Sequence, residues 1–236
     1  MMKEIIEKLN LEQDLCLLSG KEDKELRITF IKHSSLVFEY KGLLIYNDPV
    51  MDYVDYNLMP KADIILISHE HYDHFDPKAI EVLKKKHTII VSNPVVYETL
   101  KEGICLRNGE RADLIDCIKI KALPAYNTTL GRDKFHPRHR DNGYVLDLEG
   151  SKIYIAGDTE LIPEMKELKD QIEIAFLPVN QPYTMTIDQA TEAALQINPK
   201  ILYPYHYGET QIKTPINDLK TNLKDSKIDV RIRKME

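Results

Sequence analysis

Cysteine is scarce in this chain of 236 residues, and its three cysteines, Cys16, Cys105 and Cys117, lie far apart. They form no Cys-x-x-Cys pair and no even-numbered disulfide framework. Secreted domains with small cores commonly depend on such frameworks, whereas reduced compartments leave cysteines as ordinary buried residues. We therefore expect three unpaired, buried thiols and a cytoplasmic protein.

Long apolar runs are also missing. The first 26 residues are charged throughout and lack both the apolar core and the small-residue cleavage site of a signal peptide. No segment reaches the length that a membrane-spanning helix needs. This pattern supports the cytoplasmic prediction and argues against a membrane partner.

The chain has no excess of positive charge. Its net charge is −6 and its pI is about 5.8, which argues against a general nucleic-acid-binding protein. Residues 119–140 nevertheless concentrate basic side chains, namely Lys119, Lys121, Arg132, Lys134 and Arg138, together with His136 and His139. This segment is either a solvated loop or a contact for an anionic substrate, and the sequence leaves both interpretations open.

No internal repeat, low-complexity tract or flexible linker divides the chain, so we expect one domain over residues 1–236. Apolar residues make up 43% of the sequence, enough for a substantial core. Ile5, Ile6, Leu9 and Leu11 lie among charged residues, a spacing that predicts an amphipathic helix within a leader of residues 1–25.

After the leader, short apolar runs come first in succession and later alternate with helical segments. Strands are expected over residues 26–30, 36–40, 43–47, 64–68, 88–92, much of 107–123, 144–148, 152–156, 172–177 and 201–203. Helices are expected after Asp76-Pro77, over residues 95–101 and 165–170, and from the Thr-x-x-Gln capping box at residue 186 to residue 197. This order predicts an α+β fold with two packed sheets and helices outside.

The segment that carries chemistry is His-x-His-x-Asp-His, directly after the apolar run of residues 64–68. Alternate side chains of an extended chain share a face, so His69 and His71 leave the strand in the same direction. The turn toward the helix at Asp76 can bring Asp73 and His74 to the same place. Imidazoles and carboxylates are ligands for zinc, manganese and iron, so we predict a metal site here.

Further ligands must come from distant parts of the chain. Asp158 follows a strand in the sequence Ala-Gly-Asp-Thr, and the glycine before it permits a close approach. His206 follows another strand in an aromatic stretch. Asp158 taken alone could instead cap a helix from Leu161 onward, and a lone histidine among aromatic residues usually belongs to the core.

The order of these motifs resembles the metallo-β-lactamase superfamily of αββα four-layer sandwich hydrolases. The resemblance runs from the turn at His33 and the Asp48-Pro49 pair through the histidine motif and Gly157-Asp158-Thr159 to the last histidine. Residues 177–200 look like the ascorbate-6-phosphate lactonase-like branch. The resemblance implies one or two divalent ions, zinc first and manganese or iron as alternatives, whose ligands are His69, His71, Asp73, His74, Asp158 and His206. It further implies that Asp158 and a hydroxide bridge the ions, that Asp73 also assists catalysis, and that His33 and Asp48 orient ligands.

One position departs from the superfamily pattern. Where a further histidine ligand is usual, this chain has Asn127, and an amide is a poor zinc ligand. His136 or His139 could take its place. We predict that His136 reaches the metal or the substrate, because Pro137 stiffens its turn and Phe135 can anchor it.

The resemblance implies a hydrolase in which a metal-bound hydroxide attacks an ester, lactone or phosphodiester of a small anionic substrate. A homo-oligomer stays open. Two rival hypotheses are a non-catalytic metal-binding module, which would explain Asn127, and an RNA- or DNA-processing phosphodiesterase, which the acidic composition disfavours. A flavin-linked diiron protein of the same fold is expected to carry Glu where this chain has His71.

Overall fold

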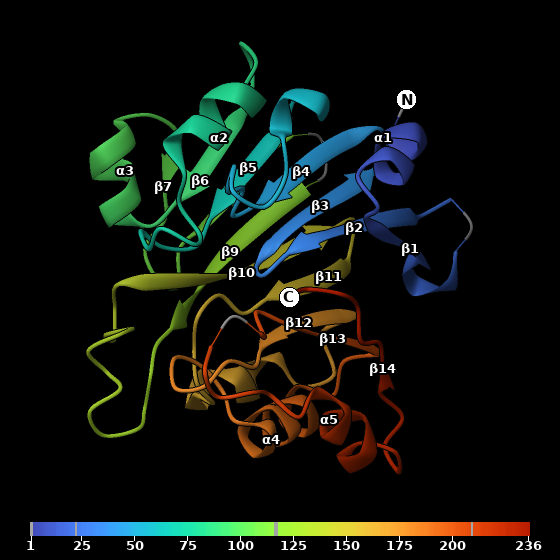
Figure 1. Cartoon of the computed structure of the whole chain (residues 1–236), viewed down its shortest axis with the longest axis vertical. Coiled ribbons are helices and arrows are strands. Elements are labelled where there is room, and N and C mark those ends of the chain that lie inside the picture. Colours follow the sequence, from blue (N-terminus) through green and yellow to red (C-terminus); the bar gives the residue numbers. More distant parts are fainter. Residues whose placement is uncertain (1, 22, 116–117, 209) are drawn as a thin grey trace. The chain divides into compact units, whose positions relative to one another are not determined.

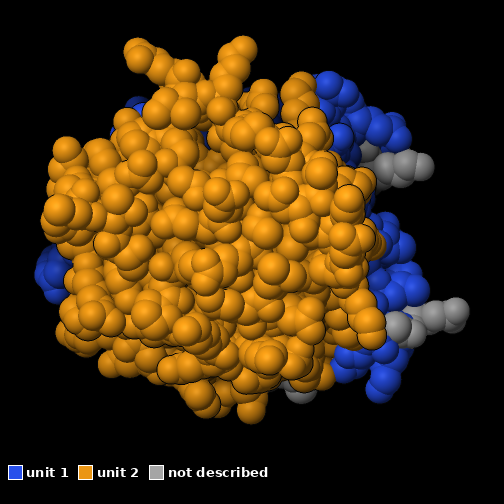
Figure 2. Space-filling model, turned by 90° about the horizontal axis from the view of Figure 1, so that it is seen from below, with its two compact units in different colours: residues 1–105, 235 blue, residues 106–234, 236 orange. Residues whose placement is uncertain are grey.

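A computed structural model describes residues 2–21, 23–115, 118–208 and 210–236. The chain divides into two compact units, which Figure 2 distinguishes by colour. Unit 1 contains residues 1–105 and Met235, and unit 2 contains residues 106–234 and Glu236. The sequence predicted one domain, and this stays a prediction. Each unit is built around one seven-stranded sheet.

The strands of unit 1 follow chain order across their sheet, from β1 to β7 (Figure 1). They are β1 (Glu12–Leu17), β2 (Glu25–Lys32), β3 (Ser35–Tyr40), β4 (Leu43–Asn47), β5 (Ile64–Ile67), β6 (Ile89–Ser92) and β7 (Ile104–Cys105). The helices are α1 (Met2–Lys8), α2 (Pro77–Leu83) and α3 (Pro94–Leu100), with short 3₁₀ turns η1 (Leu18–Gly20) and η2 (Tyr56–Leu58). The first four strands are antiparallel, and β4 to β7 are parallel.

The parallel strands β5 and β6 are short and mainly apolar, because nearly all of their side chains are buried. All four residues of β5 are buried. Helix α2 packs Ala79, Ile80 and Leu83 into one apolar cluster with Ile65 and other side chains of the sheet. Asp76 caps α2 by accepting a hydrogen bond from the backbone N–H of residue 78, and Pro77 follows, as the sequence predicted. This cap ends the loop that carries the histidine motif.

Unit 2 also follows chain order across its sheet, from β8 to β14. Its strands are β8 (Arg111–Asp113), β9 (Ile118–Ala125), β10 (Asp141–Leu148), β11 (Ser151–Ile155), β12 (Ile174–Pro178), β13 (Ile201–Tyr205) and β14 (Asp229–Val230). Its helices are η3 (Pro163–Leu168), α4 (Ile187–Ile197) and α5 (Ile216–Asn222). Strands β8 to β11 are antiparallel, and β11 to β14 are parallel.

Helices α4, α5 and η3 contribute to one apolar cluster with side chains of the unit 2 sheet. Figure 1 shows α4 and α5 beside that sheet. Helix α4 buries Ala190, Ala193, Ala194 and Ile197. The small side chains of the three alanines let the helix lie close to the strands. The predicted capping box is present, because Thr186 and Gln189 exchange hydrogen bonds at the start of α4. The helix is therefore fixed at the end that follows β12.

The prediction of a helical leader is wrong beyond its first turns. Helix α1 ends at Lys8, and residues 12–17 form the edge strand β1 against β2. Leu15 and Leu17 are exposed on that strand and Cys16 between them is buried, so burial alternates there with the two-residue period of a strand. Leu9 and Leu11, expected on the helix, pack instead as partly buried residues against the unit 1 core.

Most other predicted elements are present within a few residues of their expected bounds. The expected helix over 165–170 is the 3₁₀ helix η3, and the strand-like stretch 107–123 contains β8 and most of β9. Cys16 is buried and Cys105 is partly buried, and neither forms a disulfide. Cys117 lies outside the described residues. None of the described helices has the length and apolarity needed to cross a membrane.

Candidate metal centre

The histidine motif of unit 1 occupies the loop that follows β5. His71 accepts hydrogen bonds through its carbonyl oxygen from the backbone N–H groups of His74 and Phe75, at 3.0 and 2.8 Å, so the chain curls back as predicted. The rings of His69 and His74 are 4.1 Å apart between centroids, and those of His69 and His71 are 4.5 Å apart. The loop therefore gathers three imidazoles at the carboxyl end of one buried strand.

Asp48 organises these imidazoles from the neighbouring strand end. It follows β4, and its fully buried carboxylate accepts hydrogen bonds from the Ser68 backbone N–H and hydroxyl, both at 2.7 Å. His74 Nδ1 lies 2.9 Å from Asp48 Oδ2 and donates its proton to it. Asp48 thus orients a predicted ligand, the role that the superfamily resemblance implied.

Ser68 extends the same arrangement to His69. Its hydroxyl hydrogen goes to Asp48, so its oxygen accepts the proton of His69 Nδ1 at 3.0 Å. With Nδ1 as the donor in both His69 and His74, the neutral form of each ring leaves Nε2 without a proton and able to bind a cation. Asp48 and Ser68 therefore select the tautomers that a metal site requires.

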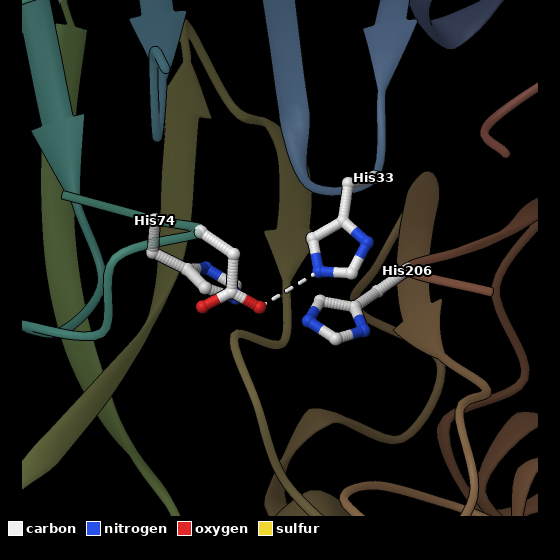
Figure 3. Close-up of side chains that lie close together, drawn as sticks. His33, His74 and His206 are labelled. Atoms are coloured by element: carbon white, nitrogen blue, oxygen red, sulfur yellow. Dashed lines mark hydrogen bonds and ion pairs between the residues drawn. The ribbon is translucent and has the colours of Figure 1, made fainter. Parts of the chain in front are cut away.

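His33 reaches the motif from the turn between β2 and β3. Its Nε2 atom lies 3.0 Å from Asp73 Oδ2, the interaction that the dashed line marks in Figure 3. One donor atom from each of His33, Asp73 and His74 lies within 4.8 Å of the others. His33 and Asp48 both have left-handed backbones, with φ of 58° and 42°. Such strain in non-glycine residues concentrates at functional sites.

Unit 2 holds a second group of donors. Strands β11 and β13 lie parallel on either side of β12, so Asp158 and His206, which follow them, come from the same edge of the sheet. His206 Nε2 lies 3.1 Å from Asp158 Oδ2, and His136 Nε2 lies 3.3 Å from the same oxygen. All three side chains are at most 3% exposed. Two imidazoles thus converge on one buried carboxylate.

Gly157 sets the backbone that presents Asp158. Its φ is +67°, and a Cβ atom there would lie 2.6 Å from the carbonyl oxygen of Asn142. Only glycine fits this close approach between the end of β11 and strand β10. The sequence Gly-Asp therefore has a steric cause.

Asn127 does not point its amide nitrogen to the donors of unit 2. Its Nδ2 donates to the carbonyl oxygens of Arg132 and Tyr183, at 3.1 and 2.8 Å, and its backbone N–H donates to the carbonyl of His136 at 2.9 Å. The hydrogen bonds of Asn127 thus hold together the loop that carries His136. His139, the other candidate, is exposed with φ of 71°.

The loop over residues 127–140 is anchored by Glu160. The side chain of Glu160 is fully buried, and its Oε2 accepts hydrogen bonds from the backbone N–H groups of Thr128 and Thr129 at 2.8 and 2.6 Å. Burial raises the pKa of the Glu160 carboxyl, but hydrogen bonds from Thr129 and Thr128 outweigh burial and hold its pKa below the usual value. Arg132 Nη1 adds an ion pair at 3.2 Å.

Glu164 makes a second anchor for this loop. It pairs with Arg138 at 3.2 Å and accepts a 2.9 Å hydrogen bond from the Tyr126 hydroxyl, while the Arg138 guanidinium lies 4.9 Å from the Tyr126 ring. The loop cations Arg132 and Arg138, for which the sequence left open a contact with an anionic substrate, are paired with carboxylates of their own unit. Phe135 packs on Tyr183, with ring centroids 4.9 Å apart, and holds the turn before His136.

Two residues of this arrangement, Ser68 and Glu160, were not predicted from the sequence. Ser68 links Asp48 to His69, and its only sequence signal is its place between a buried strand and the first histidine. Glu160 follows Asp158 by two residues, but its role depends on a loop about 30 residues earlier in the chain. Neither contact has a local pattern that would predict it.

The donor chemistry fits divalent transition metals. Every predicted ligand offers an imidazole nitrogen or a carboxylate oxygen, the donor types that zinc, manganese and iron accept in proteins. Hydrogen bonds that His69 and His74 donate to Ser68 and Asp48 hold both rings in one orientation, as is usual around protein-bound metals.

Comparison with known proteins places the chain in a family. Residues 27–206 match the family described as "Beta-lactamase superfamily domain". The chain belongs to the β-lactamase superfamily. A UPF0173 metal-dependent hydrolase of Nanoarchaeum equitans is 32% identical over 192 residues, covering 78% of this chain and 84% of the relative.

Solved structures agree with this assignment to the β-lactamase superfamily. The crystal structure of a candidate metal-dependent hydrolase from Parabacteroides distasonis has a TM-score of 0.89 and 57% identity, covering 96% of this chain and all of that one. Igni18, a metallo hydrolase from Ignicoccus hospitalis, has a TM-score of 0.76 and 26% identity, covering 89% and 95%. The predicted metallo-β-lactamase fold is confirmed, as is the prediction of a metal-dependent hydrolase.

Proposed function

We propose that this hydrolase binds one or two divalent ions, zinc first and manganese or iron as alternatives. The ligands in this proposal are His69, His71, Asp73, His74, Asp158 and His206. Its main support is the Asp48–Ser68 arrangement, which fixes His69 and His74 with Nε2 ready for a cation. The bound metal would supply a water of lowered pKa as the nucleophile.

The chain's own residues have distinct tasks in this reaction. Asp48 orients His74 through Nδ1, and His33 holds one oxygen of Asp73 at 3.0 Å. Asp73 is 21% exposed, the most accessible of these carboxylates, so it can accept a proton from the attacking water. Asp158 is nearly inaccessible and serves binding alone.

His136 takes the role of the histidine that is missing at Asn127. Its side chain is buried, and its Nε2 lies 3.3 Å from Asp158. Asn127 closes the loop that presents it. In this proposal His136 either binds the metal or contacts the substrate beside it.

We propose an ester, lactone or phosphodiester as the bond that is cleaved, in a small anionic substrate. The lactonase-like branch remains our preferred subfamily because residues 177–200 resemble it. Arg132 and Arg138 do not support an anionic substrate, since Glu160 and Glu164 neutralise them. The metal charge is then the main attraction for the anion.

The experiment compares metal content and turnover. Protein purified without chelator is analysed for bound metals, and hydrolysis of a lactone, an aryl ester and an aryl phosphodiester is measured with zinc, manganese or iron. Variants His74→Ala and His206→Ala test one donor from each unit, and His87→Ala is the control because His87 is exposed. We expect both ligand variants to lose metal and activity while the control keeps both.

Two results would contradict the proposal. Absence of bound metal after supplementation with all three ions would refute the centre. Full metal content without hydrolysis of any of the three substrate types would favour the non-catalytic metal-binding module.

A further inference from the structure

One face of the unit 2 sheet carries two rows of side chains that run across the strands, and the two rows differ in their balance of positive and negative charge. In the first row Asp113 lies opposite Lys119 on β9, Lys119 lies opposite Asp147 on β10, and Asp147 lies opposite Lys152 on β11. The charges alternate in sign across four strands. Each cation of this row therefore lies beside an acidic neighbour.

The adjacent row lacks that balance. Arg111 lies directly opposite Lys121, and the next residue across the sheet is the apolar Val145. Like charges directly opposite each other destabilise a strand pair. Among the residues that the structure describes, no carboxylate forms an ion pair with Arg111 or Lys121, whereas Lys119 lies 3.9 Å from Asp113.

This unbalanced pair lines a cavity. The cavity has a volume of about 640 Å³ and is bounded by the strands β8 to β11 and by η3 and the turn after it. Its lining includes four cations and three carboxylates, namely Arg111, Lys119, Lys121 and Lys152 with Asp113, Asp147 and, on η3, Glu167. Gln171 accepts a 3.0 Å hydrogen bond from Lys152 and so keeps that lysine against the turn.

We propose that Arg111 and Lys121 form a binding site for a phosphate-type oxyanion in this cavity. The planar guanidinium can donate two parallel hydrogen bonds to such an anion, and the ammonium adds a second charge-assisted contact. A bound oxyanion would relieve the repulsion between the two cations. Charged edge strands such as β8 can also serve only to prevent sheet association, which predicts no binding.

Calorimetric titration of the metal-loaded protein with inorganic phosphate, at constant ionic strength, tests this site. We expect Arg111→Gln and Lys121→Gln each to weaken binding about tenfold, because each removes a charge-assisted hydrogen bond. Lys119→Gln is the matched control, since it removes one positive charge from the same cavity but from the balanced row. We expect it to change the affinity less than about threefold.

Two further measurements sharpen the result. Glu167→Gln should tighten phosphate binding, because it removes a negative charge from the cavity wall. Titration with glycerol phosphate beside inorganic phosphate shows whether the site takes a phosphate ester or the free ion. Phosphate held at the metal centre would give a binding signal that none of these substitutions changes. The phosphate site can therefore be refuted without refuting the proposed hydrolytic function.

The proposal is overturned if only that insensitive signal is observed. It is also overturned if Lys119→Gln weakens binding as much as Arg111→Gln and Lys121→Gln, since that would show diffuse attraction by positive charge. Hydrolytic activity should stay unchanged in all of these variants.

Discussion

Gly157 makes the steric requirement of the metal centre testable at a single residue. Gly157→Ala places a Cβ 2.6 Å from the Asn142 carbonyl oxygen in a backbone with positive φ. We expect the free energy of unfolding to fall by roughly 2–4 kcal/mol and metal affinity to fall as Asp158 shifts. Denaturant unfolding and metal titration measure these effects.

Gly150→Ala is the control for Gly157→Ala. Gly150 has φ of +93°, but a Cβ there meets nothing within 4 Å. We expect a loss of roughly 1–2 kcal/mol from backbone strain and unchanged metal affinity. Equal metal affinity in both variants would mean that the position of Asp158 does not depend on Gly157.

His136 and His139 lie in the same loop with different surroundings. His136 is buried beside Asp158, and His139 is exposed. We expect His136→Ala to lose at least about tenfold in activity, as losses of groups that orient or ligate metals commonly do, and His139→Ala to keep wild-type values. Lost activity with retained metal would assign His136 to the substrate, and full activity with full metal content would remove it from the centre.

At the scale of elements, the loop over residues 127–140 depends on two carboxylates with different burial. The side chain of Glu160 is fully buried, and its carboxylate accepts hydrogen bonds from four donor groups. The side chain of Glu164 is 25% exposed. We expect Glu160→Gln to lower the free energy of unfolding by roughly 2–3 kcal/mol, and Glu164→Gln by at most about 1 kcal/mol. A larger loss in Glu164→Gln would show that the loop is held mainly by its exposed anchor.

Glu164 also predicts a dependence on pH. Burial raises the pKa of its carboxyl, but hydrogen bonds from its own backbone, Tyr126 and Arg138 outweigh burial, so its pKa lies below the usual value. A carboxyl with a lowered folded-state pKa stabilises the fold above its unfolded pKa, and this contribution is lost as pH falls. The difference in unfolding free energy between wild type and Glu164→Gln should therefore shrink between about pH 5 and pH 3. A difference that grows on acidification would contradict this.

At the scale of the whole molecule, metal binding should stabilise the folded chain. We expect at least one and up to two tightly bound ions per chain, and a fall in Tm of several degrees after chelation, because ligands bound only by the folded state stabilise it. Calorimetry before and after chelation measures this, with zinc added back as the control. If the protein binds metal but its Tm does not change after chelation, metal binding does not stabilise the fold, contrary to this prediction.

Much of this protein was predictable from local patterns. The His-x-His-x-Asp-His segment, the caps of α2 and α4 and the buried parallel strands each follow from spacing or residue type within about ten residues. The leader was predicted wrongly because its apolar residues suit a helix and an edge strand alike, and pairing with β2 decided for the strand.

The sequence by itself determined which groups can bind metal, because imidazoles and carboxylates, which are good ligands for transition metals, directly follow several predicted strands. Only the tertiary structure decided how they are oriented. Asp48 meets Ser68 because β4 and β5 lie side by side, and Glu160 reaches Thr128 because β9 and β11 end at one edge of their sheet. Tautomers and loop anchors depend on such contacts between residues 20 or more positions apart, and no local pattern encodes them.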